Sequence, residues 1–274
     1  MIEILKSILF GIVQGITEWL PISSTGHMIL LNEFVTLDVT PEFWEMFKVV
    51  IQFGSILAVV LLFWKKLFPF DFKSKNIIKK DIMQMWFKVV VGCIPAGLLV
   101  VFGLDEICDA LFQNYLTVAI MLILFGVLFI VIENRNKNMK PKVTDIAQIT
   151  YKTAFIIGIF QLIAAVFPGT SRSGSTIVGA LLLGVSRTIA AEFTFYLAIP
   201  TMLGASLLKL VKFGLAFSTS EIVILFVGMM VAFVVSVIVI RFLMDYIKRH
   251  DFKIFGWYRI VLGLVVIAYF MFFA

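Results

Sequence analysis

The sequence contains little cysteine, histidine or charge. Of its 274 residues, two are cysteine, two are histidine and 15% are charged, whereas an average soluble domain is about 25% charged. Cys93 and Cys108 lack the spacing of a metal motif, and nothing in the sequence supports a disulfide between them. No basic region precedes the first apolar run, so we expect no removable signal peptide.

What the chain has instead is apolar side chains. They make up 61% of the residues, and the mean hydropathy is +1.07. These values predict an all-α integral membrane protein surrounded by membrane lipids. The net charge of +6 comes largely from lysines in loops next to apolar segments. That placement is typical of membrane topology, so we expect no nucleic-acid partner.

Six segments are long and apolar enough to cross a bilayer. We predict transmembrane helices at about residues 45–64, 86–104, 115–133, 193–213, 222–244 and 255–273. Two further stretches, about 3–31 and 153–185, are apolar at both ends and interrupted by Pro, Gly and hydroxyl residues. Each has the length of two half-helices joined by a turn, so we interpret both as re-entrant helical hairpins.

Loop charge predicts how these segments are oriented. Lysine and arginine concentrate in residues 65–81, 134–152 and 241–253, which should therefore face the cytoplasm. The acidic or neutral loops at 32–44 and 104–114 should face outward. The first hairpin then enters from outside and the second from the cytoplasm, which makes an inverted-topology repeat. We expect a single membrane domain over 1–274, with repeat one at about 1–135 and repeat two at about 150–274.

The two hairpins align without a gap at an offset of 147 residues. Gly11 falls on Gly158, Gln14 on Gln161, Pro21 on Pro168 and Ser24 on Ser171. The offset also places Thr25 on Arg172 and His27 on Gly174. Because polar groups are costly in hydrocarbon, two matched polar clusters indicate one functional site built from two halves.

The first hairpin carries candidate acid–base groups. Gln14 and Glu18 share a helix face, since they are four residues apart. After the break at Pro21, a turn with N-cap chemistry follows, and it contains Ser23, Ser24, Thr25, Gly26 and His27. Gln14, Ser23, Thr25 and Gly26 are the candidates for substrate binding in this hairpin.

The second hairpin carries a candidate phosphate clamp. Arg172 lies between hydroxyl residues, and its planar guanidinium suits bidentate binding of phosphate. The neighbouring candidates for binding are Ser171, Ser173, Gly174 and Thr176. A carboxylate, an imidazole, an arginine and several hydroxyl donors together favour phosphoryl transfer.

Other interpretations of these residues stay open. Glu18 could be a structural carboxylate paired with Arg172, and some hydroxyls could only satisfy broken backbone. An inverted repeat with broken helices is also typical of secondary transporters or lipid flippases. In that case Arg172 would hold an anionic substrate and Glu18 would couple protons. A structural scaffold does not explain two matched polar clusters.

Residues 15–27 (GITEWLPISSTGH) and 168–176 (PGTSRSGST) resemble the undecaprenyl-diphosphate phosphatase family of the bacitracin-resistance type. The resemblance covers nearly the whole chain. It implies a bacterial cell-membrane hydrolase that removes the terminal phosphate of undecaprenyl diphosphate, and so recycles the lipid carrier used in peptidoglycan synthesis. It also implies catalytic roles for Glu18, Ser24, His27 and Arg172, with the hydroxyls of Ser171, Ser173 and Thr176 beside the arginine.

The resemblance further implies a divalent cation, Mg²⁺ or Ca²⁺, with Glu18 as its candidate ligand. Some family members carry a second glutamate where this chain has Gln14, so a site with two carboxylates is in doubt here. We expect a polyprenyl diphosphate substrate and a pocket that opens to the outer face. Whether Ser24 is the nucleophile or orients water stays open, as do homodimer formation and the preferred prenyl chain length.

Overall fold

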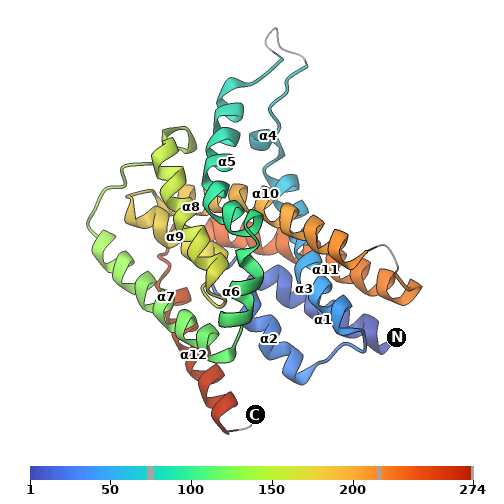
Figure 1. The fold of residues 1–274 in the computed structure, drawn as a ribbon. Helices are drawn as coiled ribbons and strands as arrows, with labels where there is room; N and C mark the ends of the chain where they lie inside the picture. Colours follow the sequence, from blue (N-terminus) through green and yellow to red (C-terminus); the bar gives the residue numbers. More distant parts are fainter. Residues whose placement is uncertain (73–76, 215–216, 273–274) are drawn as a thin grey trace.

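Helices make up the fold of the protein in the computed structural model, which describes residues 1–72, 77–214 and 217–272 (Figure 1). Within these ranges, six helices are long and apolar enough to cross a membrane. They are α3 (Pro41–Leu62), α5 (Lys80–Val101), α7 (Tyr115–Asn136), α10 (Arg187–Phe213), α11 (Thr219–Tyr246) and α12 (Lys253–Phe272). The six predicted spans are therefore confirmed as helices.

Several of these helices begin before the predicted apolar segments. Helix α3 begins at Pro41, because the Thr40 side chain accepts from the backbone N–H of Phe43 and caps the first turn. Helix α11 begins at Thr219 because Ser218 and Glu221 form a capping box. Caps extend these helices into polar sequence that hydropathy alone does not assign.

Short helices occupy segments between the spans. They are α4 (Trp64–Leu67), α6 (Leu104–Phe112) and the 3₁₀ helix η1 (Ile146–Gln148). The prediction of a loop throughout 104–114 was wrong for most of its length, because α6 is an amphipathic helix. The segment is too short and too polar to cross a membrane, so the hydropathy that identifies spans does not assign it a helix.

Each predicted hairpin segment folds as two helices joined by a turn. The first contains α1 (Ile2–Thr17) and α2 (Ser24–Phe34), and the second contains α8 (Tyr151–Val166) and α9 (Arg172–Leu182). Ser23 and Ser171 cap the second helix of each pair, with φ of 73° and 67°. Among the described residues they are the only non-glycine residues with positive φ. The two turns therefore share one uncommon backbone conformation.

The helices cross at glycines from both halves of the chain. A Cβ on Gly11 of α1 would lie 2.7 Å from the carbonyl oxygen of Gly228 in α11. Its aligned counterpart, Gly158 of α8, makes the matching approach to Gly92 in α5, at 2.4 Å. Because no side chain fits between these backbones, each hairpin packs against a span of the other half.

A third glycine crossing joins the last span of each half. Gly126 of α7 and Gly256 of α12 approach each other's carbonyl oxygens, with built Cβ distances of 2.7 Å in both directions. The two chain halves are therefore interleaved into one helical body (Figure 1).

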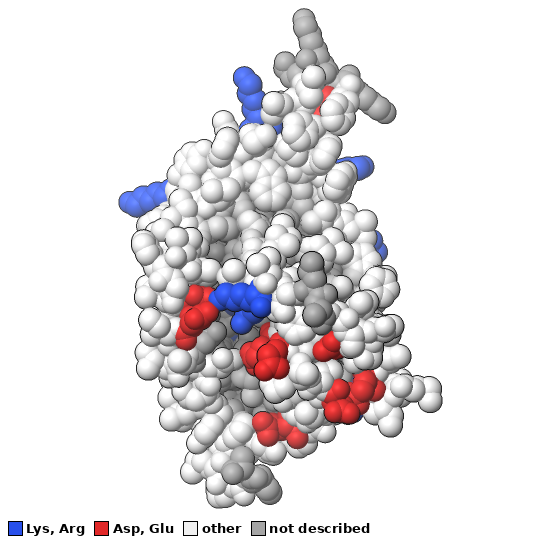
Figure 2. Space-filling view, turned by 45° about the vertical axis from the view of Figure 1, so that its right-hand side comes forward, with Lys and Arg blue, Asp and Glu red and all other residues white. Residues whose placement is uncertain are grey.

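Charge divides the surface along its length. In Figure 2 most acidic side chains on this face lie in its lower half, whereas basic side chains project from the upper half and from a group near the centre. Lys212 at the end of α10 is ion-paired with Glu106 of α6.

Candidate active site

Glu18 is the centre of the polar contacts between the two hairpins. It directly follows α1, and only 6% of its surface is exposed. Its Oε2 accepts from Ser24 Oγ at 2.8 Å and from Gln14 Nε2 at 3.0 Å. Its Oε1 accepts from an Arg172 guanidinium nitrogen at 3.0 Å. Residues from both hairpins thus hold one buried carboxylate.

The two groups that reach Glu18 across the turns occupy equivalent places in the fold. Ser24 and Arg172 are the first residues of α2 and α9. Their capping serines, Ser23 and Ser171, accept from the backbone N–H groups of Gly26 and Gly174 respectively.

This equivalence corrects the alignment of the turns. The gapless offset of 147 holds for the helices that enter them, but the caps correspond at an offset of 148, so Arg172 is the counterpart of Ser24 rather than of Thr25. By the same offset His27 corresponds to Ser175. The backbone of each turn decides this register, and Ser23 with Ser171 and Gly26 with Gly174 are also identical at the offset of 148.

Arg172 is fixed by a second set of contacts. Its guanidinium donates to the carbonyl oxygen of Thr194 in α10 at 3.1 Å as well as to Glu18. Thr176 Oγ1 lies 2.9 Å from Thr194 Oγ1 and donates to the carbonyl oxygen of Arg172. Ser173 Oγ donates to the backbone oxygen of Glu18 at 3.1 Å. These bonds orient the arginine toward the first hairpin.

A cavity of about 200 Å³ opens beside this group. Glu18, Ser24 and Arg172 line it together, as do the predicted binding residues Thr25 and Ser171. Helices α3, α5, α8 and α10 contribute the remaining wall, which consists of Gln52, Ala96, Gln161, Ala164, Ala165, Thr201, Met202 and Ala205, with Pro168 and Gly169 from the second turn. A phosphate group fits this volume. The lining combines one carboxylate, one guanidinium and several hydroxyls.

His27 lies apart from the cavity and from the contacts of Glu18 with Ser24 and Arg172. Its Nδ1 is 2.7 Å from the backbone oxygen of Ser23, and its Nε2 is 2.7 Å from the hydroxyl of Tyr258 in α12. The Tyr258 ring stacks on the imidazole. A carbonyl can only accept, so Nδ1 carries a proton, and in the neutral form of the ring Nε2 then accepts from the Tyr258 hydroxyl. His27 is not among the residues that line the cavity.

Arg259 is a site residue that the sequence interpretation missed. It is fully buried on α12 and donates to the backbone oxygens of Pro21, Gly169 and Thr170. The guanidinium therefore ties both hairpin turns together. An arginine at the fifth residue of the otherwise apolar predicted span 255–273 was the available signal, because such a charge in a membrane segment marks a functional or structural role.

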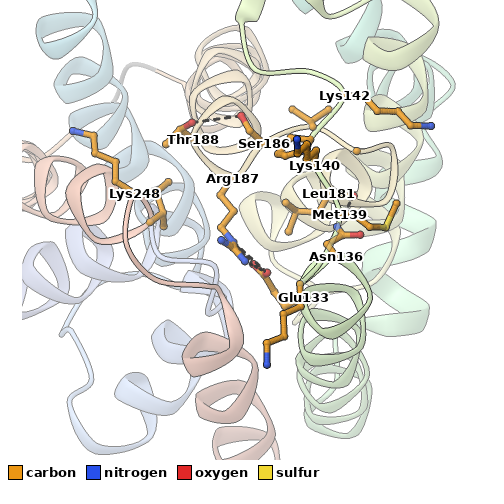
Figure 3. Close-up of a pocket in the computed structure, with 15 residues that line it drawn as sticks. Glu133, Asn136, Met139, Lys140, Lys142, Leu181, Ser186, Arg187, Thr188 and Lys248 are labelled. Carbon is orange, nitrogen blue, oxygen red and sulfur yellow. Dashed lines mark hydrogen bonds and ion pairs between the residues drawn. The ribbon is translucent and has the colours of Figure 1, made fainter.

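A larger cavity of about 370 Å³ lies elsewhere in the molecule (Figure 3). Its buried acid, Glu133, is held by Arg187 with oxygen–nitrogen distances from 2.6 Å and also accepts from the backbone N–H of Phe252. Lys142 and Lys248 point to opposite sides of this cavity rather than toward a common centre. We interpret the Glu133–Arg187 pair as a structural link between α7, α10 and α12.

The ligand atoms around Glu18 suit a cation site that the protein completes together with a bound phosphate, rather than a site built from protein ligands alone. Among the described residues, no three His, Cys, Asp or Glu side chains group as metal ligands. Gln14 Oε1 is buried, however, and has no hydrogen-bond partner among those residues. One carboxylate and one amide oxygen are hard ligands, which would need further oxygens from a bound phosphate to hold Mg²⁺ or Ca²⁺.

The sequence also matches a known protein family over most of its length. Residues 7–265 match the family model described as "Bacitracin resistance protein BacA". The chain belongs to this family. The match spans both hairpins and all six long helices, and membership agrees with a multi-pass membrane protein.

Close relatives share almost the entire length of the chain. A protein named undecaprenyl-diphosphatase from Desulfitobacterium hafniense is 66% identical, covering 98% of this chain and 97% of its own. Undecaprenyl-diphosphatase 1 from Clostridium acetobutylicum is 65% identical over 98% of both chains. An undecaprenyl-diphosphatase from Enterococcus faecalis is 61% identical over 97% of this chain and 96% of its own.

Proposed function

We propose that the protein is an undecaprenyl-diphosphate phosphatase. It hydrolyses the terminal phosphoanhydride bond with one water, releases inorganic phosphate and returns undecaprenyl phosphate to cell-wall synthesis. The observation that carries this proposal is the contact of Ser24 and Arg172 with the two oxygens of one buried Glu18, beside a cavity the size of a phosphate. The relatives' names favour hydrolysis over the transporter or flippase alternative.

The short contact between Ser24 and Glu18 supports nucleophilic chemistry. Glu18 Oε2 is within hydrogen-bond reach of the Ser24 hydroxyl and is suited to accept its proton as general base. In the covalent version, Ser24 Oγ attacks the terminal phosphorus, undecaprenyl phosphate leaves, and water then hydrolyses the phosphoserine. In the direct version, the same pair orients an attacking water. The position of Ser24 at the start of α2 directs either nucleophile into the cavity.

Arg172 supports charge stabilisation of the transferring phosphoryl group. It is anchored by Thr194, and the other N–H groups of its fork remain available to phosphate oxygens. Like Ser24, it starts a short helix whose free backbone N–H groups favour an anion. The cavity thus offers positive charge and donors from the second hairpin, opposite the acid–base pair of the first.

A divalent cation would bind at Glu18 and Gln14 Oε1, with diphosphate oxygens completing its coordination. When bound, the cation would neutralise charge on the diphosphate. His27 lies beyond the cavity wall, where it would move protons between the turn and Tyr258.

We further propose that the two halves form an inverted-topology repeat whose hairpins are re-entrant. The exchanged packing of α1 on α11 and of α8 on α5, together with the matched positive-φ caps, supports this arrangement. Three spans follow each hairpin, so the second half begins on the opposite side of the membrane. In the cell membrane, the distribution of loop charge supports an orientation in which the active site faces outward.

Phosphate release from farnesyl diphosphate in detergent tests the activity. Wild type should release phosphate, and Glu18→Gln and Arg172→Ala should each reduce kcat/KM by about 100-fold or more, since each removes a charge beside the reacting group. Thermal melting should show both variants folded. A folded wild type that releases no phosphate from this or longer prenyl diphosphates contradicts the proposal and favours transport.

A further inference from the structure

Gln161 is the counterpart of Gln14 in the second hairpin, but it lacks the same partner. In the first hairpin, Gln14 Nε2 donates to the carboxylate of Glu18, one helical turn later. One turn after Gln161 the chain has Ala165 instead. The helices align at the offset of 147, so Gln161 and Ala165 occupy the places of the Gln14–Glu18 pair. The second copy of the pair keeps the amide donor and lacks the acceptor.

The missing acceptor leaves the amide nitrogen of Gln161 buried without a hydrogen bond. Gln161 is 2% exposed, and its Nε2 has no hydrogen-bond partner by distance among the described residues. The nearby Cys93 thiol is only a weak acceptor for an amide. Its Oε1 accepts a long bond of 3.5 Å from Thr201 Oγ1, whose stronger bond of 2.8 Å goes to the backbone oxygen of Leu197. A buried donor without an acceptor costs about 1–3 kcal/mol and needs an explanation.

The place of Gln161 in the cavity supplies that explanation. Gln161 and Ala165 both line the 200 Å³ cavity that Glu18, Ser24 and Arg172 also line. The methyl group of Ala165 is much smaller than a glutamate side chain, so it leaves open the room that the carboxylate fills in the first hairpin. An anionic oxygen placed there would complete the bond that Gln161 lacks.

We propose that Gln161 is a substrate-binding residue whose Nε2–H donates to a non-bridging oxygen of the bound diphosphate. The substrate oxygen takes the role that a carboxylate oxygen of Glu18 has toward Gln14. Ala165 contributes by being small, and Thr201 holds the amide from the opposite edge. The inference rests on the proposed phosphatase function and assigns one further contact within the same cavity.

Steady-state hydrolysis of farnesyl diphosphate by three variants tests this contact. Gln161→Met keeps length and removes the donor, so KM should rise about 10- to 100-fold with a smaller change in kcat. Gln161→Glu places a negative charge against the diphosphate and should raise KM further. Ala165→Glu rebuilds the pair of the first hairpin inside the cavity, so it should abolish turnover while keeping the melting temperature.

Binding of inorganic pyrophosphate separates recognition from folding. Its inhibition constant should rise in Gln161→Met in parallel with KM, which a merely structural role would not produce. Gln84→Met, an exposed glutamine on α5, is the matched control and should leave both constants unchanged. Unchanged KM and inhibition constant in a folded Gln161→Met enzyme overturn the inference alone. A wild type without activity overturns the proposed function instead.

Discussion

Ser24 and Arg172 reach opposite oxygens of the same carboxylate from the first turns of two short helices. The structural and catalytic interpretations of Glu18 therefore do not exclude each other. Arg172 holds one oxygen of the carboxylate, which leaves the other oxygen facing the Ser24 hydroxyl as a hydrogen-bond acceptor. At the residue scale, the ion pair prepares the base rather than only stabilising the fold.

Substitution of Ser24 separates the two nucleophiles. Ser24→Ala should abolish hydrolysis and covalent labelling if the hydroxyl attacks phosphorus. If water attacks, it should lower kcat by only about 10- to 100-fold through loss of orientation. Rapid quench with a terminally ³²P-labelled prenyl diphosphate measures both quantities. No trapped phosphoenzyme, together with substantial residual activity in Ser24→Ala, would falsify the covalent version.

Removal of the Tyr258 hydroxyl tests the role of His27. Tyr258→Phe keeps the ring that stacks on the imidazole and removes the partner of Nε2. We expect kcat/KM to fall about 3- to 10-fold, the equivalent of about 1 kcal/mol, and the pH–rate profile to move. An unchanged profile in Tyr258→Phe, with only lower stability in His27→Ala, would assign His27 a structural role.

At the element scale, glycines set how closely the hairpins approach the spans. Gly158 of α8 leaves no room for a methyl group, because the backbone oxygen of Gly92 lies 2.4 Å from the built Cβ. Gly204 of α10, by contrast, has nothing within 4 Å of its built Cβ. The two glycines form a matched pair for testing helix packing.

Alanine at these two glycines should have opposite effects. Gly158→Ala forces α8 away from α5 and should destabilise the protein by about 1–3 kcal/mol, which lowers the melting temperature in detergent. Gly204→Ala should be neutral or stabilise by up to about 1 kcal/mol, since alanine favours helix. Equal melting temperatures for the two variants would contradict the close crossing of α5 and α8.

At the scale of the whole molecule, Arg259 unites the halves. Its guanidinium is fully buried and donates to backbone oxygens of both hairpin turns, and among the described residues no carboxylate forms a salt bridge with it. Each carbonyl would otherwise lie unpaired away from water. The last span thus holds the two turns at the separation that brings Ser24 and Arg172 onto Glu18.

Arg259→Met should disrupt both turns together. The loss of several buried hydrogen bonds should cost about 3 kcal/mol or more and reduce hydrolysis, although Arg259 does not line the cavity. Arg259→Lys should recover part of the stability, since one ammonium replaces some of the bonds. Melting temperature and activity measured together check this prediction, and wild-type values for Arg259→Met would contradict it.

The proposed orientation is open to labelling in intact cells. In a background with Cys93 and Cys108 replaced by serine, Asp38→Cys should react with a membrane-impermeant maleimide, because the proposed orientation places the loop before α3 outside the cell. Lys140→Cys, in the basic loop after α7, should react only after the cells are opened. Both positions are exposed in the structure. The reverse pattern would invert the topology and place the cavity toward the cytoplasm.

The sequence by itself determined the membrane class, the six spans and the residues of the two polar clusters. Hydropathy needs only apolar length, and costly polar groups such as Glu18 and Arg172 are visible without a fold. Tertiary structure decided the register of the turns, the contact of His27 with Tyr258, and the positions of Arg259 and Gln161. Those features depend on backbone conformation and on contacts between distant segments, which local sequence does not contain.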